Sequence, residues 1–297
     1  MIQNLDLINN FRNTKSVIAN ANNAITINSA KQATEIGLIE PILVGNEEFI
    51  QSEVQKLKWK IDSKNVVNAR DEAESAHISC KLAKSDEISL IIKGHMHTDI
   101  LMGEYIKSEH ALRLKGERLS HIWFMTFQDK EREPIIITDG ALNIKPSLET
   151  KKSIIKNVIN FTSKIKNFDP KIAILSATEE ILDQMDSSSD AGKLMQWSKI
   201  SFPDQKIFGP LAFDNAISKE AALIKGISNP VAGNANIIIV PNIETGNSLV
   251  KIMVNFMNCV AGGFIVGGKV PVVITSRSDN VESRLSSISN AILSIDR

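Results

Sequence analysis

The chain has 297 residues, of which 34 are basic and 34 acidic, so its formal net charge is zero. A balanced charge without a run dense in Lys or Arg argues against nucleic acid or an anionic membrane as the main partner, and no stretch approaches the ~18 apolar residues that span a bilayer. Cys80 and Cys259 form no CxxC pair and the polar N-terminus lacks the apolar stretch of a signal peptide, so we expect a cytoplasmic protein without a disulfide framework or a zinc site.

Short apolar runs alternate with helical stretches along the whole chain. Runs at 17–19, 42–44 and 88–92 predict strands, and 71–84 predicts a helix. Further strands are predicted at 122–125, 135–138, 172–175, 206–208, 237–240 and 270–275. Continuous apolar strands that alternate with helices are typical of a parallel sheet covered on both faces. The fold class is therefore α/β, and the large number of strands favours two domains.

Two predicted helices near the C-terminus have clear 3.6-residue periodicity. The second has apolar residues at positions 281, 285, 288, 292 and 295, as expected of an amphipathic helix. The first, around residues 249–260, also carries Val250 and Val254 on its other face. We therefore expect the first of these helices to be buried nearly all round or to lie at a subunit contact.

The segment that follows the predicted strand 270–275 is the most informative one for function. Ligands of doubly wound sheets bind beyond the carboxyl ends of strands, and here Ser276 and Arg277 precede a helix. A helix N-terminus binds anions, and the planar guanidinium of arginine suits phosphate. A second interpretation is that Asp279 caps the helix and Glu282 completes a capping box. Capping leaves Ser276 and Arg277 without an explanation.

Two other polar segments follow predicted strands. The segment 241–247 (PNIETGN) is either a polar turn or a wall of a binding cleft. The segment 93–99 contains His95 and His97, and imidazoles are common metal ligands. Because no third ligand stands at a recognisable spacing, we expect no metal there.

Two patterns imitate known sites. Residues 263–269 match GxxxxGK, but Val270 stands where a P-loop needs Ser or Thr, and the apolar interior of the loop suits a strand. Asp183, Asp186 and Asp190 would lie on one side of a helix as a cation site. The serines around these aspartates favour a solvated loop, which is the interpretation we adopt.

Six segments together carry a resemblance to a known family, and they are KGHMHTDIL (93–101), LSH (119–121), ITDGALNIKP (137–146), GPLAFDNAIS (209–218), VAGNANIIIVPNIETGN (231–247) and GGKVPVVITSRSD (267–279). In these segments the chain resembles the phosphate acetyltransferase and phosphate butyryltransferase family. Their order and spacing agree from about residue 19 to the C-terminus. The TSRSD form and the absence of a long N-terminal extension look more like the butyryl branch.

The resemblance implies a fold of two α/β/α domains with an active-site cleft between them, similar to isocitrate and isopropylmalate dehydrogenases. The first domain would be residues 1–132 plus 266–297, and the second, inserted domain would be residues 133–265. The resemblance also implies a homodimer that holds no metal and no prosthetic group. Its partners would be acyl-CoA, phosphate and acyl phosphate, with coenzyme A as a substrate.

The implied reaction is acyl-CoA plus phosphate to acyl phosphate plus coenzyme A, with a short acyl chain, butyryl preferred and acetyl possible. In the reverse direction, which consumes acyl phosphate, the thiolate of coenzyme A attacks the acyl carbonyl directly in a ternary complex. Ser276 would hold the thiol near attack geometry, and Arg277 would bind the phosphoryl group and stabilise developing charge. The substrate-binding residues implied by the resemblance are Lys93, Thr98, Arg113, Asn242, Glu244, Gly246, Asn247 and Asp279.

The chain departs from the family pattern at two positions and by one extra residue after Leu114. Acetyl-type members have a general-base aspartate where this chain has Ser283, so the nearby Glu282 is our candidate base. An arginine is common where this chain has Gly103. These departures motivate one alternative, a degenerate member that acts as a binding or regulatory protein. A second alternative is a metal-dependent dehydrogenase on the same fold, which requires clustered aspartate ligands and a nicotinamide site.

Overall fold

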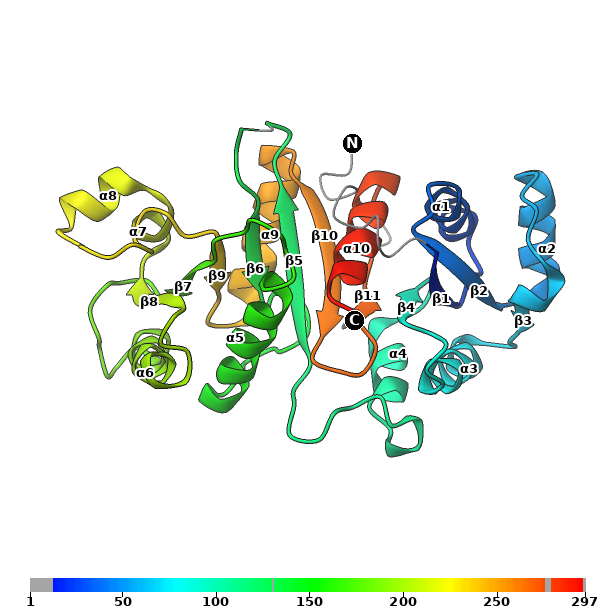
Figure 1. Cartoon of the computed structure of the whole chain (residues 1–297), viewed down its shortest axis with the longest axis horizontal. Coiled ribbons are helices and arrows are strands. Elements are labelled where there is room, and N and C mark those ends of the chain that lie inside the picture. Colours follow the sequence, from blue (N-terminus) through cyan, green and yellow to red (C-terminus); the bar gives the residue numbers. More distant parts are fainter. Residues whose placement is uncertain (1–12, 130, 276–278, 296–297) are drawn as a thin grey trace. The chain divides into compact units, whose positions relative to one another are not determined.

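The computed structural model describes residues 13–129, 131–275 and 279–295. The chain divides into two compact units, one formed by Met1–Arg118 and Gly262–Arg297 and the other by Leu119–Ala261. Each unit is a sheet with helices on both faces (Figure 1), so the fold is the mixed α/β fold that the sequence predicts. The domain boundaries at residues 132 and 266 stay a prediction.

The first unit is built on a sheet with the strand order β3-β2-β1-β4-β11-β10. All neighbouring strands are parallel except β10 and β11. Helices α3 and α4 pack together on one face, and α1 and α10 pack together on the other (Figure 1). The elements of this unit are β1 (Thr14–Ala19), α1 (Ala24–Glu35), β2 (Ile39–Gly45), α2 (Glu47–Lys56), η2 (Ser63–Asn65), β3 (Val66–Asn68), α3 (Glu72–Lys84), β4 (Leu90–Lys93), α4 (Thr98–Tyr105), η3 (Ser108–His110), most of β10 (Val260–Val266), β11 (Val272–Val273) and α10 (Val281–Leu293).

The second unit has the strand order β5-β6-β9-β7-β8, with β5 antiparallel to β6 and the other pairs parallel. Helices α5 and α6 cover one face, and α7 and α9 cover the other. The carboxyl ends of β6, β9, β7 and β8 therefore meet at one edge. The elements are β5 (Ser120–Thr126), β6 (Ile135–Thr138), α5 (Leu148–Thr162), β7 (Lys171–Leu175), α6 (Asp186–Ser201), β8 (Lys206–Leu211), α7 (Phe213–Ile217), α8 (Lys219–Ile224), β9 (Ile237–Ile239) and α9 (Ile243–Met257).

Every predicted strand overlaps an observed strand, because an uninterrupted apolar run has to be buried on both faces of a sheet. The predicted helix 71–84 is α3, whose N-cap Asp71 accepts a hydrogen bond from the Glu74 backbone N–H at 2.8 Å. The GxxxxGK stretch falls largely in β10, which confirms that it is a strand and no P-loop. The expectation of parallel pairing is wrong for β5 with β6 and for β10 with β11, since burial does not determine the direction of a strand.

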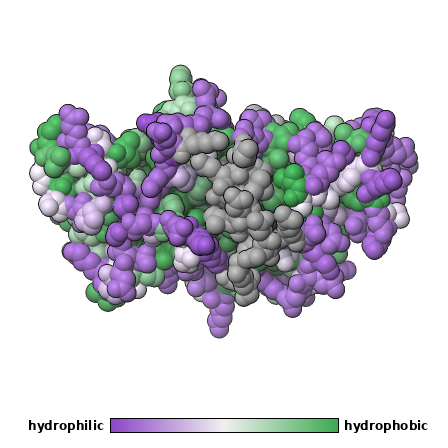
Figure 2. Space-filling view, turned by 45° about the horizontal axis from the view of Figure 1, so that its top comes forward, coloured by the Kyte–Doolittle hydropathy of each residue, from purple (hydrophilic) through white to green (hydrophobic). Residues whose placement is uncertain are grey.

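The surface is of mixed polarity. On the face in Figure 2, hydrophilic residues are widespread and hydrophobic residues lie between them. Among the helices that the structure describes, none combines the length and apolar character needed to cross a membrane.

A buried carboxylate connects three helical elements of the first unit. Glu104 of α4 accepts hydrogen bonds from His77 Nδ1 of α3 at 2.9 Å and from His110 Nε2 of η3 at 2.6 Å, and it pairs with Lys107 Nζ at 2.5 Å. Burial alone would raise the pKa of Glu104, but the hydrogen bonds from Lys107, His110 and His77 outweigh it and hold the pKa at about 2. The ionised carboxylate is therefore the stable form in the fold.

We expect Glu104→Gln to lower the free energy of unfolding by roughly 1.5–3 kcal/mol at neutral pH, the range for hydrogen bonds to a charged group. The folded pKa lies below the ordinary value of 4.5, so the contribution of the carboxylate is present above that pH and is lost as the pH falls towards 2. Urea denaturation across this range should show the difference between variant and wild type shrinking with acid.

The matched control is Glu109→Gln. The Glu109 side chain is 59% exposed and lies 3.7 Å from His110 Nε2, so its neutralisation should change the free energy of unfolding by less than ~0.5 kcal/mol. Equal destabilisation by the two substitutions would contradict the role given to Glu104.

Candidate active site

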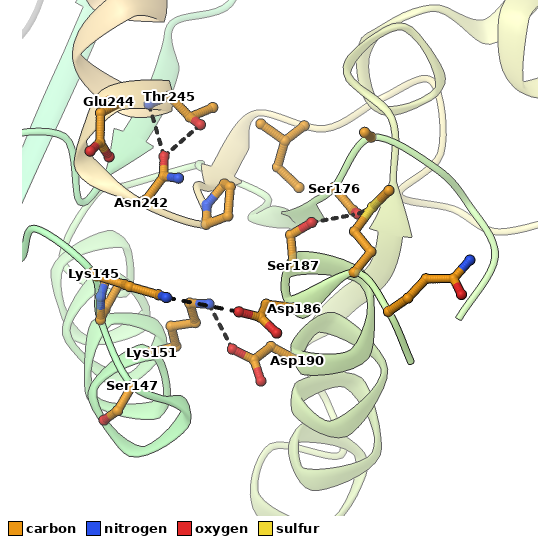
Figure 3. A pocket seen from close by; sticks show the side chains of 16 residues that line it. Lys145, Ser147, Lys151, Ser176, Asp186, Ser187, Asp190, Asn242, Glu244 and Thr245 are labelled. Atoms are coloured by element: carbon orange, nitrogen blue, oxygen red, sulfur yellow. Dashed lines mark hydrogen bonds and ion pairs between the residues drawn. The ribbon is translucent and has the colours of Figure 1, made fainter. Parts of the chain in front are cut away.

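A pocket of about 1110 Å³ lies beyond the carboxyl ends of β7 and β9 in the second unit (Figure 3). Ser176 follows β7, and Asn242 follows β9. Strand ends of an open α/β sheet are the usual place for ligands, and the volume is at the upper end for small-molecule sites. The sixteen lining residues are Lys145, Pro146, Ser147, Lys151, Leu175, Ser176, Ala177, Gln184, Met185, Asp186, Ser187, Asp190, Pro241, Asn242, Glu244 and Thr245.

One wall of this pocket is the N-terminus of α9. Asn242 is the N-cap, and its side-chain oxygen accepts hydrogen bonds from the Thr245 backbone N–H at 3.0 Å and from the Thr245 hydroxyl at 2.7 Å. Glu244 stands exposed in the first turn and lines the pocket (Figure 3). Asn242 and Glu244, both predicted to bind substrate, therefore share one pocket with the positive end of a helix.

The opposite side carries two lysines that point toward α6 (Figure 3). Lys151 of α5 is buried and pairs with Asp190 at 2.8 Å, whereas the exposed Lys145 lies 3.9 Å from Asp186. The solvated loop predicted around the three aspartates holds for Asp183, which is exposed in a turn, and is wrong for Asp186 and Asp190, because α6 begins at Asp186. The serines there occupy the first turn of a helix, where short polar side chains are favourable.

Gly246 and Asn247 do not appear among the lining residues but hold α9 against the loop after β6. Gly246 is buried, and the Asn247 side-chain amide donates to the Gly140 carbonyl at 3.4 Å. A Cβ atom on Gly246 would lie 2.6 Å from Gly140 Cα. Asp139 organises the same loop, since its carboxylate accepts hydrogen bonds from the Ala141 and Leu142 backbone N–H groups at 3.0 and 2.8 Å. These residues position the pocket wall.

The first unit contains a small pocket of about 70 Å³ where β4 and β11 end. Lys93 is buried, and its Nζ donates to the carbonyls of Met96 at 2.9 Å and Gly94 at 3.4 Å. The lining residues are Asn23, Ile25, Thr26, Lys93, Gly94, His95, Thr275 and Arg284.

Arg284 of α10 is also buried, and it contacts both Thr275 and Asp279. Its Nε donates to the Asp279 backbone carbonyl and its Nη1 to the Thr275 hydroxyl, each at 3.2 Å. Burial lowers the pKa of Arg284, and the Asp279 carboxylate acts in the opposite direction. The guanidinium nevertheless stays charged, because arginine does not deprotonate in proteins.

The predicted catalytic pair Ser276 and Arg277 lies outside the described residues. The capping box predicted after it is wrong: α10 begins one residue later, Asn280 is the N-cap, and its side chain accepts from the Ser283 backbone N–H at 2.9 Å. Glu282 stands in the first turn of α10. Asp279 precedes the cap and contributes its carbonyl to Arg284.

Two other predicted substrate-binding residues do not line either of these pockets. Thr98 is the first residue of α4 and is half-buried. Arg113 is exposed and forms an isolated bridge with Gly268. Gly103 is exposed on α4 with open space beside it.

Several pocket residues are not predicted from the sequence, above all Arg284 and Lys151. Arg284 did leave a signal, since it stands three residues after Val281 and four before Ile288, on the apolar face of an amphipathic helix. A cation at such a position is buried and needs a partner. Lys151 left no comparable signal because its partner Asp190 is distant in sequence.

One further group of side chains has the composition of a metal site. His77, Glu104, Glu109 and His110 place one ligand atom each within 4.8 Å of one another. The Glu104 carboxylate is already engaged by both imidazoles and by Lys107. In this arrangement the group is a hydrogen-bonded connection between α3, α4 and η3.

The chain matches a family model described as phosphate acetyl/butaryl transferase over residues 111–292. It is 38% identical over 258 residues to a phosphate acetyltransferase of Rickettsia prowazekii, covering 86% of this chain and 73% of the relative. It is 32% identical over 282 residues to a probable phosphate butyryltransferase of Bacillus subtilis, covering 95% and 93%. A crystal structure of a branched-chain phosphotransacylase from Enterococcus faecalis superposes with a TM-score of 0.78 at 32% identity, covering 94% and 98%.

We expect Gly246→Ala to destabilise the protein by roughly 1–3 kcal/mol, because the new methyl group would push α9 away from Gly140. The control is Gly103→Ala, also in a helix but with nothing within 4 Å of the added Cβ, which should stabilise by about 0.5–1 kcal/mol. Thermal and urea denaturation measure both. Effects of the same sign would contradict the close approach at Gly246.

Proposed function

The chain belongs to the phosphate acetyl/butaryl transferase family, and from this premise we propose that it transfers a short acyl group between coenzyme A and inorganic phosphate. The observation that carries the proposal is that identity above 30% extends over most of the chain, to acetyl- and butyryltransferases alike. The conversion is an acyltransferase reaction with acyl-CoA and phosphate as substrates and acyl phosphate and coenzyme A as products. No resident cofactor takes part in the proposed chemistry.

The proposed step is direct attack in a ternary complex. When acyl phosphate is the substrate, the thiolate sulfur forms a bond to the acyl carbon. The bond from that carbon to the phosphate oxygen breaks, and phosphate leaves with the electron pair. Ser276 would orient the thiol and Arg277 would bind the phosphoryl group, where charge develops. Support from the described residues comes from Thr275, which directly precedes this pair and lines a pocket with two cationic side chains.

The general base is a separate part of the proposal. Ser283, at the position where acetyl-type members have an aspartate, is buried, and its backbone carbonyl accepts from the Ser287 hydroxyl at 2.8 Å. A serine hydroxyl does not titrate near neutrality, so it cannot remove the thiol proton by itself. Glu282, the neighbouring carboxylate in the first turn of α10, is the candidate.

The acyl chain is proposed to be short, with butyryl preferred and acetyl accepted. The TSRSD segment supports the butyryl preference, while identity is higher to the acetyltransferase of Rickettsia prowazekii, at 38%, than to the butyryltransferase of Bacillus subtilis, at 32%. One methylene changes binding in an apolar pocket by only ~1–3 kcal/mol, so both chain lengths should react.

We also propose a homodimer in the cytoplasm. The prediction that α9 is buried all round is wrong within this chain, since Ile252 is 49% and Phe256 83% exposed. The predicted alternative, a subunit contact, accounts for two large apolar side chains one turn apart on the outside of the helix. The cytoplasmic location agrees with the free cysteines Cys80 and Cys259 and is tested by cell fractionation.

The proposed reaction predicts phosphate-dependent release of free thiol from short acyl-CoA thioesters. Purified protein should react with acetyl-, butyryl- and branched-chain acyl-CoA, fastest with butyryl-CoA, and at an unchanged rate after treatment with EDTA. Absence of phosphate-dependent release from every short acyl-CoA would favour the alternative of a binding or regulatory protein, motivated by Gly103 and Ser283.

Two substitutions separate the proposed roles near α10. Arg277→Ala should lower kcat/KM for phosphate at least ~10-fold, because the lost charge acts in the transition state. Glu282→Gln should lower kcat with little change in the phosphate KM, because the amide cannot accept the thiol proton. If Glu282→Gln keeps its turnover but loses thermal stability, Glu282 is not the base and instead stabilises the N-terminus of α10.

The dimer is tested with two equally exposed apolar residues. Phe256→Glu should convert the dimer to a monomer in size-exclusion chromatography with light scattering. Ile200→Glu, on α6 at a site that is 85% exposed, should leave the dimer intact. A monomeric wild type, or dissociation by both substitutions, would remove α9 from the interface.

A further inference from the structure

Four side chains at the junction of α3, α4 and η3 each offer one atom that can ligate a metal ion, and these atoms lie within 4.8 Å of one another. The four residues are His77, Glu104, Glu109 and His110. We propose that this group is a structural site for one divalent transition-metal ion of the zinc type. The site belongs to the first unit alone and does not rest on the proposed acyl transfer.

The spacing of the ligand atoms suits a four-coordinate ion. Glu104 Oε1 lies 2.9 Å from His77 Nδ1 and 2.6 Å from His110 Nε2, and Glu109 Oε1 lies 3.7 Å from the same Nε2 atom. Around an ion with ligands at ~2.0–2.2 Å, tetrahedral geometry separates neighbouring ligand atoms by about 3.3–3.6 Å. The observed distances lie on both sides of this range, so small rotations of the side chains bring the four atoms to it.

The two oxygens of the Glu104 carboxylate have different neighbours. His77 and His110 both contact Oε1, whereas Lys107 Nζ lies 2.5 Å from Oε2. An ion at the meeting point of the two imidazoles therefore takes Oε1 as a ligand and leaves the contact with Lys107 in place. Hydrogen bonds to the second oxygen orient a ligating carboxylate in many metal sites, and Lys107 provides that support here.

Binding of the ion exchanges hydrogen bonds for metal–nitrogen bonds. In the metal-free fold, the ionised Glu104 can only accept, so each neutral imidazole donates the N–H group that faces Oε1. Coordination uses the lone pair of that nitrogen, and the proton moves to the other nitrogen of the ring. The His77 ring is 48% exposed and has access to water for its second N–H group.

The group is fixed on its inner side and open on its outer side. Glu104 and His110 are buried, and His77 and Glu109 are exposed. The end of α3 is tied to η3, because Lys84 Nζ donates to the Glu109 backbone carbonyl at 3.0 Å. The buried pair is therefore held in place before the ion arrives, and the exposed pair gives the ion a path from solvent.

The donor atoms determine the class of ion. Two imidazole nitrogens with carboxylate oxygens suit Zn²⁺ and its neighbours Co²⁺ and Ni²⁺, whereas Mg²⁺ and Ca²⁺ prefer sites built from oxygen atoms alone. With both imidazoles neutral, the carboxylates of Glu104 and Glu109 exceed the single ammonium of Lys107. The net negative charge of the group attracts a cation.

The ion stabilises the fold and takes no part in the chemistry. Tyr105, next to Glu104, is fully buried, and its hydroxyl donates to the Val270 carbonyl at 2.7 Å. An ion that holds Glu104 therefore also fixes the end of α4 against the segment that leads into β11. None of the four ligands lines the two pockets described above, so removal of the ion should lower the melting temperature without changing the rate of acyl transfer.

The first experiment measures binding of the metal alone. The full chain is freed of metal with a chelator and titrated with Zn²⁺ in a calorimeter, and its melting temperature is followed by circular dichroism. One ion per chain should bind, and the melting temperature should rise by at least ~2 °C at zinc concentrations far above Kd. Co²⁺ should show the visible absorption of a four-coordinate ion. No binding of Zn²⁺ at micromolar concentration, or an equal response to Mg²⁺, would overturn the site.

Two histidine substitutions locate the ion. His77→Ala removes an exposed ligand, should leave the fold intact, and should lower the affinity for Zn²⁺ at least ~10-fold. His97→Ala removes an exposed imidazole that forms no cap hydrogen bond at α4, and it should keep the affinity of the wild type. A loss of affinity in His97→Ala with none in His77→Ala would place the ion at residues 93–99 and reject the site at α3, α4 and η3.

The effect of zinc on each variant separates a metal site from a group that is only hydrogen-bonded. Both roles predict that His77→Ala loses stability in metal-free buffer, where Glu109→Gln should change stability little. A metal site predicts in addition that zinc no longer stabilises His77→Ala and stabilises Glu109→Gln less than wild type. An undiminished rise of the melting temperature with zinc in both variants would overturn the proposal, whatever the result of the acyl-transfer assay.

Discussion

The parallel pairing of β4 with β11 is the constraint on which the small pocket of the first unit depends. Residues of these strands are far apart in the sequence, yet the register of Ile91 with Val272 brings their carboxyl ends together. Lys93 therefore lies near Thr275, and α10, which begins just beyond, adds Arg284 to the same pocket. A sheet of buried apolar strands can tolerate such cations only at its ends, where carbonyls and hydroxyls are available to hold them.

In the second unit a larger pocket also lies beyond the carboxyl ends of parallel strands. The ends of β7 and β9 carry Ser176 and Asn242 to one edge, and α9 starts there with a capped N-terminus. Because Gly246 packs directly on Gly140, α9 comes closer to the sheet than any residue with a Cβ atom would permit. Each of the two pockets thus combines strand ends with a helix N-terminus, an arrangement that favours anions.

The sequence predicts the elements well and their partners poorly, and the reason is physical. An apolar run such as 135–138 has to be a buried strand, but nothing within it records whether its neighbour runs parallel or antiparallel. The ion pair of Lys151 with Asp190 and the contacts of Arg284 depend on folding distant segments together. The predicted residues Asn242 and Glu244 do share a pocket, and Lys93 lines the other, whereas Thr98 and Arg113 line neither.

The residue at which α10 begins determines which side chain caps the helix and which side chains lie in its first turn. With Asn280 as the cap, the helix presents Glu282 and Ser283 in its first turn and turns Arg284 inward, toward Thr275. Had Asp279 been the cap, Glu282 would have stood three residues after it, in the position of a capping box. With Asn280 as the N-cap, Ser283 and not Glu282 stands three residues after the cap, and the buried Arg284 follows Ser283 directly. The first turn of α10 therefore carries a carboxylate, Glu282, and a buried guanidinium, Arg284, close together in the chain.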